Sequence, residues 1–200
     1  MLVLEKYVFY EETIKNSRFL SELIPCDEQS RAREIIKEQK NKYPEARHVV
    51  HGFVIGKSGE ICGMSDDGEP SGTAGRPLLD VLRGHDCTNT LLTITRWFGG
   101  ILLGTGGLVK AYGGGAKAVL AKADEEGAFV PLVKKKSFSF AVDYSFYKIA
   151  KKILHDFNIF DLKEDFGTEI SISGKIEASQ SDFFSHKIND ASNGKIIVTL

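Results

Sequence analysis

The amino-acid sequence predicts an α+β protein made of two compact domains. Its 200 residues suit one large domain or two small ones, and its 42% hydrophobic and 26% charged residues are typical of a folded globular chain. Segments with β-type alternation and segments with helical periodicity follow one another along the whole chain. A basic linker around Lys134 separates two such series, so we expect one domain over residues 1–130 and another over residues 136–200.

The elements of the first domain follow from the spacing of its apolar and turn-forming residues. Two β-rich stretches on either side of Lys15-Asn16-Ser17 predict an opening hairpin. Apolar residues at helical spacing after Asp27 predict a helix with this aspartate as its N-cap. The later strand and helix are almost continuously apolar, which indicates burial on more than one side. The expected elements are, in order, strands at 7–14 and 18–24, a helix at 27–44, strands at 48–55 and 60–64, a short helix at 76–83, a strand at 89–97 and a helix at 108–123.

The second domain shows a clear βαββαβ pattern. Phe138, Phe140 and Val142 alternate with small or polar residues, as in a half-buried strand. Ser179 is the expected cap of the second helix, and Asn193-Gly194 predicts a turn before the last strand. The expected elements are strands at 138–142, 159–164, 170–176 and 196–200, with helices at 146–157 and 179–191. This order is that of the ferredoxin-like split βαβ fold.

Composition and charge exclude several classes of protein. The net charge is −1, so a general attraction to nucleic acid is absent and any RNA binding must rest on a local patch. No run of 18 apolar residues is present and the first ten residues lack a signal pattern, so we expect a cytoplasmic protein with no membrane partner. The three cysteines, Cys26, Cys62 and Cys87, form no CxxC pair, which argues against a disulfide framework or structural zinc.

Two glycine-rich segments, 66–77 and 95–116, lead towards predicted helix N-termini. The unpaired N–H groups and partial positive charge of such a terminus favour an anion, and glycine lets backbone amides turn towards it. Phosphate, including the phosphate of RNA, is therefore the expected ligand. The candidate phosphate- or RNA-binding residues are Ser71, Gly72, Thr73, Gly75, Arg76, Arg96, Gly99, Gly100, Gly104, Gly106, Gly107 and Lys110.

A structural interpretation of the same glycines stays equally open: they would allow tight turns and close helix–sheet packing. Neither segment is a standard nucleotide motif, because Val109 stands where GxGxxG requires its last glycine and no GK[ST] sequence exists. For Gly113-Gly114-Gly115, inside the predicted helix, close packing against the sheet is the favoured explanation.

Three acidic residues, Asp66, Asp67 and Glu69, could hold Mg²⁺ or exchange protons, although a solvated turn is the favoured interpretation. His48 and His51 lie three apart on a predicted strand, so their side chains point to opposite faces and cannot share a metal. No cofactor and no metal are therefore assigned. Trp97 and Phe98 could stack on bases, but a core aromatic pair is favoured.

The longer motifs resemble those of a known family. The string from Ser65 to Gly75, SDDGEPSGTAG, is followed by TRWFGG at 95–100 and LGTGGL at 103–108. Together with Ser17-Arg18-Phe19 and His48, these segments resemble the Impact N-terminal family and its YigZ-like bacterial members. Trp97 stands where tyrosine is common in that family. The resemblance extends over the whole chain.

The resemblance implies a first domain similar to domain 2 of ribosomal protein S5, followed by a ferredoxin-like domain similar to one in elongation factor G. Eukaryotic members regulate translation by competing for the activator of a starvation-responsive kinase. Two hypotheses follow: a module that binds RNA, the ribosome or a translation-related protein, or an enzyme that acts on a small phosphorylated or nucleotide substrate at the glycine-rich loops. A scaffold whose glycines serve packing alone is the third.

Overall fold

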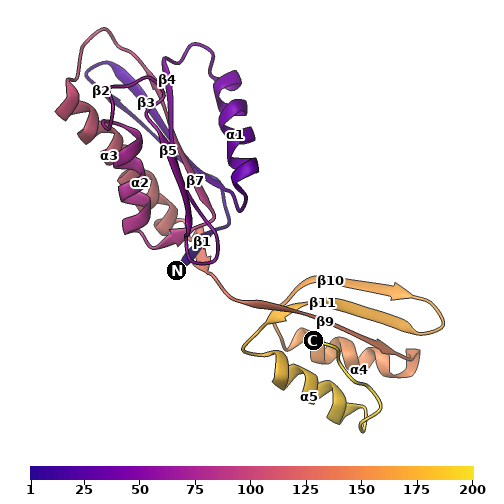
Figure 1. Cartoon of the computed structure of the whole chain (residues 1–200). Helices are drawn as coiled ribbons and strands as arrows, with labels where there is room; N and C mark the ends of the chain where they lie inside the picture. Colours follow the sequence, from indigo (N-terminus) through magenta and orange to yellow (C-terminus); the bar gives the residue numbers. More distant parts are fainter. The chain divides into compact units, whose positions relative to one another are not determined.

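An antiparallel five-stranded sheet forms the centre of the first of two units in the computed structural model, which describes residues 1–200 (Figure 1). The first unit is Met1–Leu132 and the second Val133–Leu200. The strand order is β2 (Val8–Ile14), β3 (Ser17–Pro25), β7 (Thr90–Trp97), β4 (His48–Ile55), β5 (Ile61–Ser65). Seven of the eight residues of β7 are buried, so this central strand must be covered on both faces.

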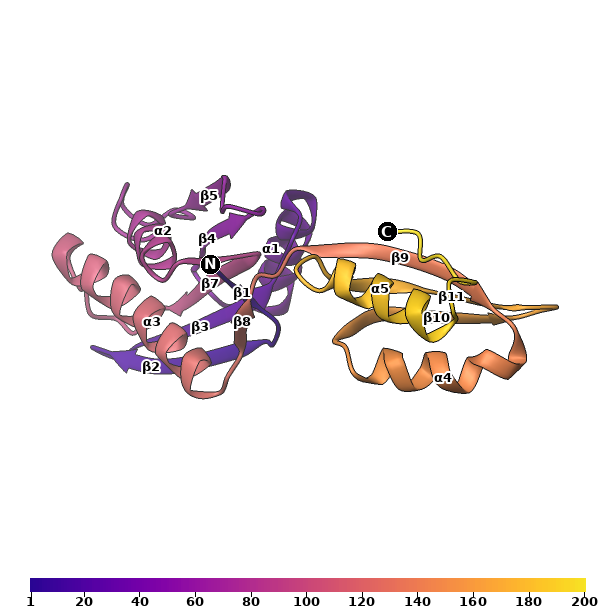
Figure 2. The ribbon, with the colours of Figure 1, turned by 90° about the horizontal axis from the view of Figure 1, so that it is seen from below.

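Helices lie on both faces of this sheet. α1 (Gln29–Lys42) lies on one face, and α2 (Gly75–Gly84) and α3 (Thr105–Glu125) lie on the other (Figures 1 and 2). The alternation of β7 explains the two layers, because Leu92 and Ile94 pack in the cluster under α2 and α3 whereas Leu91 packs in the cluster under α1. The predicted burial of this strand on more than one side is confirmed.

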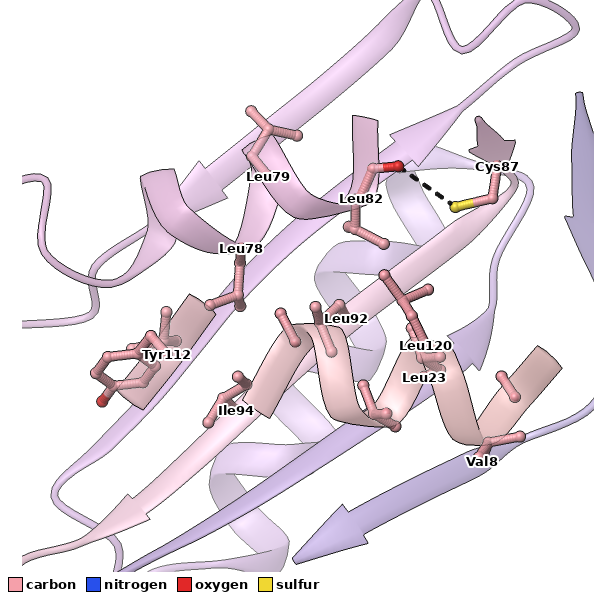
Figure 3. Close-up of a cluster of buried hydrophobic side chains, with 14 of the residues drawn as sticks. Val8, Leu23, Leu78, Leu79, Leu82, Cys87, Leu92, Ile94, Tyr112 and Leu120 are labelled. Atoms are coloured by element: carbon pink, nitrogen blue, oxygen red, sulfur yellow. Dashed lines mark hydrogen bonds between the residues drawn. The ribbon is translucent and has the colours of Figure 1, made fainter. Parts of the chain in front are cut away.

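The larger core cluster joins α2 and α3 to the sheet (Figure 3). Leu78 and Leu82 of α2 face Leu92 of β7, and Cys87 donates its thiol hydrogen to the carbonyl of Leu82 at 3.7 Å. Tyr112 of α3 is fully buried at one end of the cluster. Each such buried side chain contributes about 1.5–3 kcal/mol relative to exposure. This packing fixes both helices relative to the sheet.

A second, small sheet was not predicted. It has the order β6 (Cys87–Thr88), β1 (Leu2–Leu4), β8 (Phe129–Pro131). Strands of two or three residues are too short to give a periodic signal, so their pairing is decided by the packing around them. This sheet ties the first residues of the chain to the last residues of the first unit.

The second unit packs two helices against one face of a three-stranded sheet. Its elements are β9 (Lys135–Val142), α4 (Tyr144–His155), β10 (Ile159–Phe166), β11 (Ile170–Glu177) and α5 (Ser181–Ala191), with strand order β10-β11-β9. Phe138, Phe140 and Val142 point to the same face, where they contact residues of both helices. The mixed α+β class is confirmed by the two units together.

The predicted last strand, residues 196–200, is wrong in its extent. The segment joins the sheet only through one antiparallel bridge, between Ser139 and Thr199. The reason is that the backbone of Ile196 bonds to the end of α5: its N–H donates to Ser192 Oγ, and its carbonyl accepts from Asn189 Nδ2. Ile197 is 78% exposed as a result.

Two predicted helix caps are also wrong. α1 begins after Glu28 and α5 after Gln180, so Asp27 and Ser179 each lie one residue too early to reach the free amides of the first turn. Asp143, in contrast, caps α4 and accepts the N–H of Phe146 at 2.8 Å. No helix of either unit is both long and apolar enough to cross a membrane.

The three consecutive glycines of α3, Gly113 to Gly115, differ in what surrounds them. A Cβ on Gly115 would lie 2.7 Å from Ser21 Oγ, whereas a Cβ on Gly114 would meet no atom within 4 Å. The packing explanation therefore applies to Gly115 and not to Gly114.

We expect Gly114→Ala to raise the free energy of unfolding by about 0.5–1 kcal/mol, because alanine restricts the unfolded chain and favours the helix. Gly115→Ala gains the same propensity but must displace Ser21, so its stability should fall at least ~1 kcal/mol below that of Gly114→Ala. Urea unfolding followed by circular dichroism compares the two variants. Equal stabilities would contradict the close approach at Gly115.

Candidate anion-binding site

The first glycine-rich segment forms the loop between β5 and α2, and its amides are already occupied. Asp66 accepts the N–H groups of Gly72, Ala74 and Gly75 at 2.8, 3.0 and 2.8 Å. Burial alone would raise the pKa of Asp66, but these three bonds outweigh it and hold the pKa below its usual 3.8. The N-terminus of α2 thus carries its own anion, the Asp66 carboxylate, in the place predicted for a phosphate.

The other candidates of this segment are engaged locally as well. Thr73 Oγ1 donates to the carbonyl of Pro70 at 2.6 Å, and Arg76 pairs with Asp80 on the exposed face of α2 at 2.9 Å. Gly72, Thr73, Gly75 and Arg76 are therefore occupied within the protein. Ser71 is exposed in the same loop and does not line the cavity described below.

Asp67 fastens the same loop to β4. Its carboxylate accepts the N–H of Val49 at 2.7 Å and pairs with Lys40, and its carbonyl lies 2.8 Å from His48 Nδ1. Burial would raise the pKa of Asp67, but the bonds from Lys40 and Val49 lower it. Asp66, Asp67 and Glu69 therefore have separate partners, and no three histidine, cysteine or acidic side chains lie together as metal ligands.

Glu69 is the buried member of the acidic trio. Its Oε1 lies 2.6 Å from Arg96 Nη1 and accepts the Tyr112 hydroxyl at 2.7 Å, with His48 Nε2 at 3.9 Å. The side chains of Glu69 and Arg96 are only 4% and 6% exposed. Burial and the bond to Glu69 raise the pKa of Tyr112, so its hydroxyl remains a donor. This triad joins the β5–α2 loop, β7 and α3.

A cavity of about 330 Å³ adjoins the triad. Its walls come from the β5–α2 loop, the end of β7, the β7–α3 loop and the first turn of α3. It is lined by Arg47, His48, Gly68, Glu69, Pro70, Arg96, Phe98, Leu102, Leu103, Gly104, Thr105 and Leu108. Polar groups lie beside apolar ones, as in sites that orient a ligand.

The first turn of α3 opens onto this cavity. The helix begins at Thr105 and not at Leu108 as predicted, because Gly104 adopts φ 74° and ψ 165°, a conformation open to glycine, and serves as N-cap. No side chain caps this terminus and no acidic residue lies in its first turn, although the helix has 21 residues. Gly106 and Gly107 therefore lie in a first turn whose N–H groups and partial positive charge are not used by the protein itself.

Two polar atoms of the cavity wall have no hydrogen-bond partner within the protein. Arg96 Nε is buried and makes no hydrogen bond. Both hydrogen bonds to Glu69 fall on Oε1, so Oε2 makes none with the protein. A buried unsatisfied group is costly, so the position of Arg96 Nε beside an open helix terminus points to a bound ligand.

The remaining predicted residues divide into structural and peripheral ones. A Cβ on Gly99 would lie 2.0 Å from the backbone of Asn16, and its N–H donates to Ser17 Oγ at 3.2 Å, so Gly99 serves close packing. Gly100 turns the loop with φ 86°. Lys110 is exposed on α3 and does not line the cavity.

The interpretation of Trp97 and Phe98 as a core pair is wrong for Phe98. Trp97 packs edge-on against Tyr43 at 5.4 Å, but Phe98 is 40% exposed. Its ring lies 5.9 Å from the guanidinium of Arg47 and 5.6 Å from that of Arg96. Three further residues of the site, Arg47, Thr105 and Tyr112, were not predicted. Thr105 and Tyr112 lie within the second glycine-rich segment, but no local pattern marks them as site residues, and Arg47 lies outside both segments.

Asp66→Asn is expected to lower the free energy of unfolding by about 1–2 kcal/mol at neutral pH, because the amide keeps one acceptor oxygen and loses the bond to Gly72. The folded-state pKa of Asp66 is lowered, so its contribution is present above 3.8 and is lost as pH falls through the folded value. The difference in the free energy of unfolding between Asp66→Asn and wild type should therefore become smaller as the pH falls below 3.8. Urea unfolding at neutral pH and at a series of lower pH values measures this difference. Asp80→Asn, which changes an exposed ion pair with Arg76, is the control. An equal loss of stability in this variant would contradict the role of Asp66.

Comparison with known proteins agrees with the family suggested by the motifs. The model of the Impact N-terminal domain matches residues 15–120. An IMPACT family member of Haemophilus influenzae is 33% identical over 201 residues, covering 100% of this chain and 96% of that protein. The IMPACT family member YigZ of Escherichia coli is 44% identical over 111 residues, 54% of each chain. A crystal structure of a protein described as hypothetical is 30% identical, covers 98% of this chain and 95% of that one, and has a TM-score of 0.66. The chain belongs to the IMPACT family.

Proposed function

We propose that this protein is an RNA- or ribosome-binding module that acts in translation or its regulation. The observation that carries the proposal is the uncapped N-terminus of α3, which opens onto a cavity where buried Arg96 retains an unpartnered Nε. The phosphate of a nucleic acid is a suitable anion for both groups. Of the predicted phosphate-binding residues, Arg96 and Gly104 line this cavity, and Gly106 and Gly107 lie in the adjoining first turn of α3.

The exposed neighbours of the cavity suit a nucleic acid better than a free ion. Phe98 presents an aromatic ring on which a base can stack, and Arg47 beside it adds a positive charge. Because the net charge is −1, this local combination must supply the attraction. Affinity should therefore fall as salt rises, since each neutralised phosphate releases counterions.

Family membership supports the connection with translation. Eukaryotic relatives of the family regulate translation through a protein partner, so a translation-related protein in the cytoplasm is the second class of partner in this proposal. The fold assignments of the two domains are also part of this proposal. The order β10-β11-β9, with Thr199 beside β9, supports a ferredoxin-like second domain. The likeness of the first domain to domain 2 of ribosomal protein S5 rests on the family.

A charge at the start of α3 provides the test. Gly106→Asp places a carboxylate where a Cβ meets no atom within 4 Å, and an acid in the first turn stabilises a helix. We expect folding to be preserved and the affinity for single-stranded RNA to fall about tenfold, because like charges repel at the site. Fluorescence anisotropy with labelled RNA over a salt series measures this effect.

Gly114→Asp is the matched control. It adds the same charge on the same helix, about 12 Å further along the axis and so beyond the Debye length of about 10 Å at moderate salt. Arg76→Ala should also leave RNA affinity unchanged, because Arg76 pairs with Asp80 and does not line the cavity. Equal losses for Gly106→Asp and Gly114→Asp, or an affinity that is independent of salt, would overturn the proposal.

An enzyme for a small phosphorylated or nucleotide substrate is the second candidate, and the unpartnered Oε2 of buried Glu69 favours it. A buried carboxylate in a cavity wall can accept a proton from a substrate held by its phosphate. A thermal-shift screen of nucleotides and sugar phosphates with Mg²⁺ tests this candidate. A concentration-dependent rise in melting temperature that Glu69→Gln reduces is expected, and no shift with any compound counts against it.

A further inference from the structure

We propose that the cavity distinguishes RNA from DNA, with Glu69 Oε2 accepting a hydrogen bond from the ribose 2′-hydroxyl of the nucleotide whose phosphate lies at the start of α3. This inference rests on the proposed RNA-binding function and names the chemical group that the same site selects. It makes Glu69 a specificity-determining residue, because Glu69 contacts the sugar and the helix terminus contacts the phosphate.

Two parts of the cavity wall require different groups on a ligand. The free amides of the first turn of α3 and the hydroxyl of Thr105 favour an anion. The carboxylate of Glu69 also lines the cavity, and its Oε2 can accept a hydrogen bond from a donor. A ligand that satisfies both parts therefore carries an anionic group and a donor group within the same small cavity.

Arg96 and Tyr112 hold the carboxylate of Glu69 in one orientation. Both bind the same oxygen, Oε1, at 2.6 and 2.7 Å, so the second oxygen remains as a fixed acceptor. Because the side chain of Glu69 is 4% exposed, a ligand without a donor would shield this oxygen from water and leave it unpaired. The site therefore penalises a ligand without a donor, and does not merely favour one that has it.

A ribonucleotide fits these requirements. Its 2′-hydroxyl lies on the carbon next to the one that bears the 3′-phosphate, and it is the group by which proteins separate RNA from DNA. The cavity of about 330 Å³ is at the small end of the range for ligand sites, which suits one nucleotide and not a duplex. Pro70, Leu103 and Leu108 line it with apolar surface for the sugar, and Phe98 lies at the exposed side for the base.

The test compares three single-stranded oligonucleotides of one mixed sequence: RNA, DNA and 2′-O-methyl RNA, which keeps the RNA backbone but cannot donate from its 2′ position. Wild type should bind RNA about tenfold more tightly than the other two, the ratio expected for a hydrogen bond to a charged acceptor. Fluorescence anisotropy at one salt concentration measures the ratio. This comparison needs no variant, so it does not depend on whether a variant folds.

Two variants then test whether Glu69 causes this preference for RNA. In Glu69→Gln the amide oxygen can keep the bonds to Arg96 and Tyr112 while an NH₂ group replaces Oε2, so the preference for RNA should disappear and DNA affinity should be retained. Asp80→Asn is the matched control, because it makes the same change from acid to amide at an exposed ion pair that does not line the cavity. It should keep the RNA preference. Thermal melting checks that both variants fold.

The outcomes separate the two proposals. Equal affinity for RNA and DNA, or for RNA and its 2′-O-methyl form, would overturn the role of Glu69 while leaving RNA binding intact. A preference that depends on the bases and not on the sugar would overturn it too, since the donor would then belong to a base. Binding of none of the three oligonucleotides would remove the proposed function itself.

Discussion

The buried ion pair between Glu69 and Arg96 is the interaction on which the first unit's loops depend. It lies where three segments meet, because Glu69 comes from the β5–α2 loop, Arg96 from β7 and its third partner, Tyr112, from α3. Removing one member of such a pair leaves an uncompensated buried charge, which typically costs 3–5 kcal/mol. The pair is not required for packing alone, since apolar residues fill buried space at lower cost. Its retention is explained if the carboxylate and guanidinium also serve a ligand.

The two glycine-rich segments have similar compositions and opposite outcomes. In the first, Asp66 folds back onto the amides before α2, so the positive end of that helix is neutralised within the chain. In the second, Gly104 begins α3 without a side-chain cap and the positive end stays open. The difference is a single carboxylate in reach of the amides, and it decides which helix can bind an external anion. A small net charge is then no obstacle to binding, because the charge that matters is local.

Much of the fold could be predicted because its strands alternate and its turns are strong. The hairpin at Lys15-Asn16, the burial of β7 and the α+β class all follow from patterns within one segment. Residues 196–200 do not form the predicted strand, because side chains at the end of α5 bind the backbone of Ile196. No local sequence pattern encodes these contacts. The site was only partly predictable for the same reason. Arg96 and the glycines lie in one glycine-rich segment. Arg47 reaches the cavity through the pairing of β4 with β7, and Tyr112 reaches Glu69 through the packing of α3.

The two acidic neighbours of Glu69 in the SDDGEPSGTAG segment fix its position. The carboxylates of Asp66 and Asp67 are both occupied within the protein. Asp66 accepts backbone amides before α2, and Asp67 accepts the N–H of Val49 and pairs with Lys40. The loop is thereby fixed at both ends, and Glu69 is carried into the core without freedom to turn towards solvent. A carboxylate held in this way lines the same cavity as the uncapped start of α3. In the proposed function, such preorganisation favours a ligand that carries both matching groups.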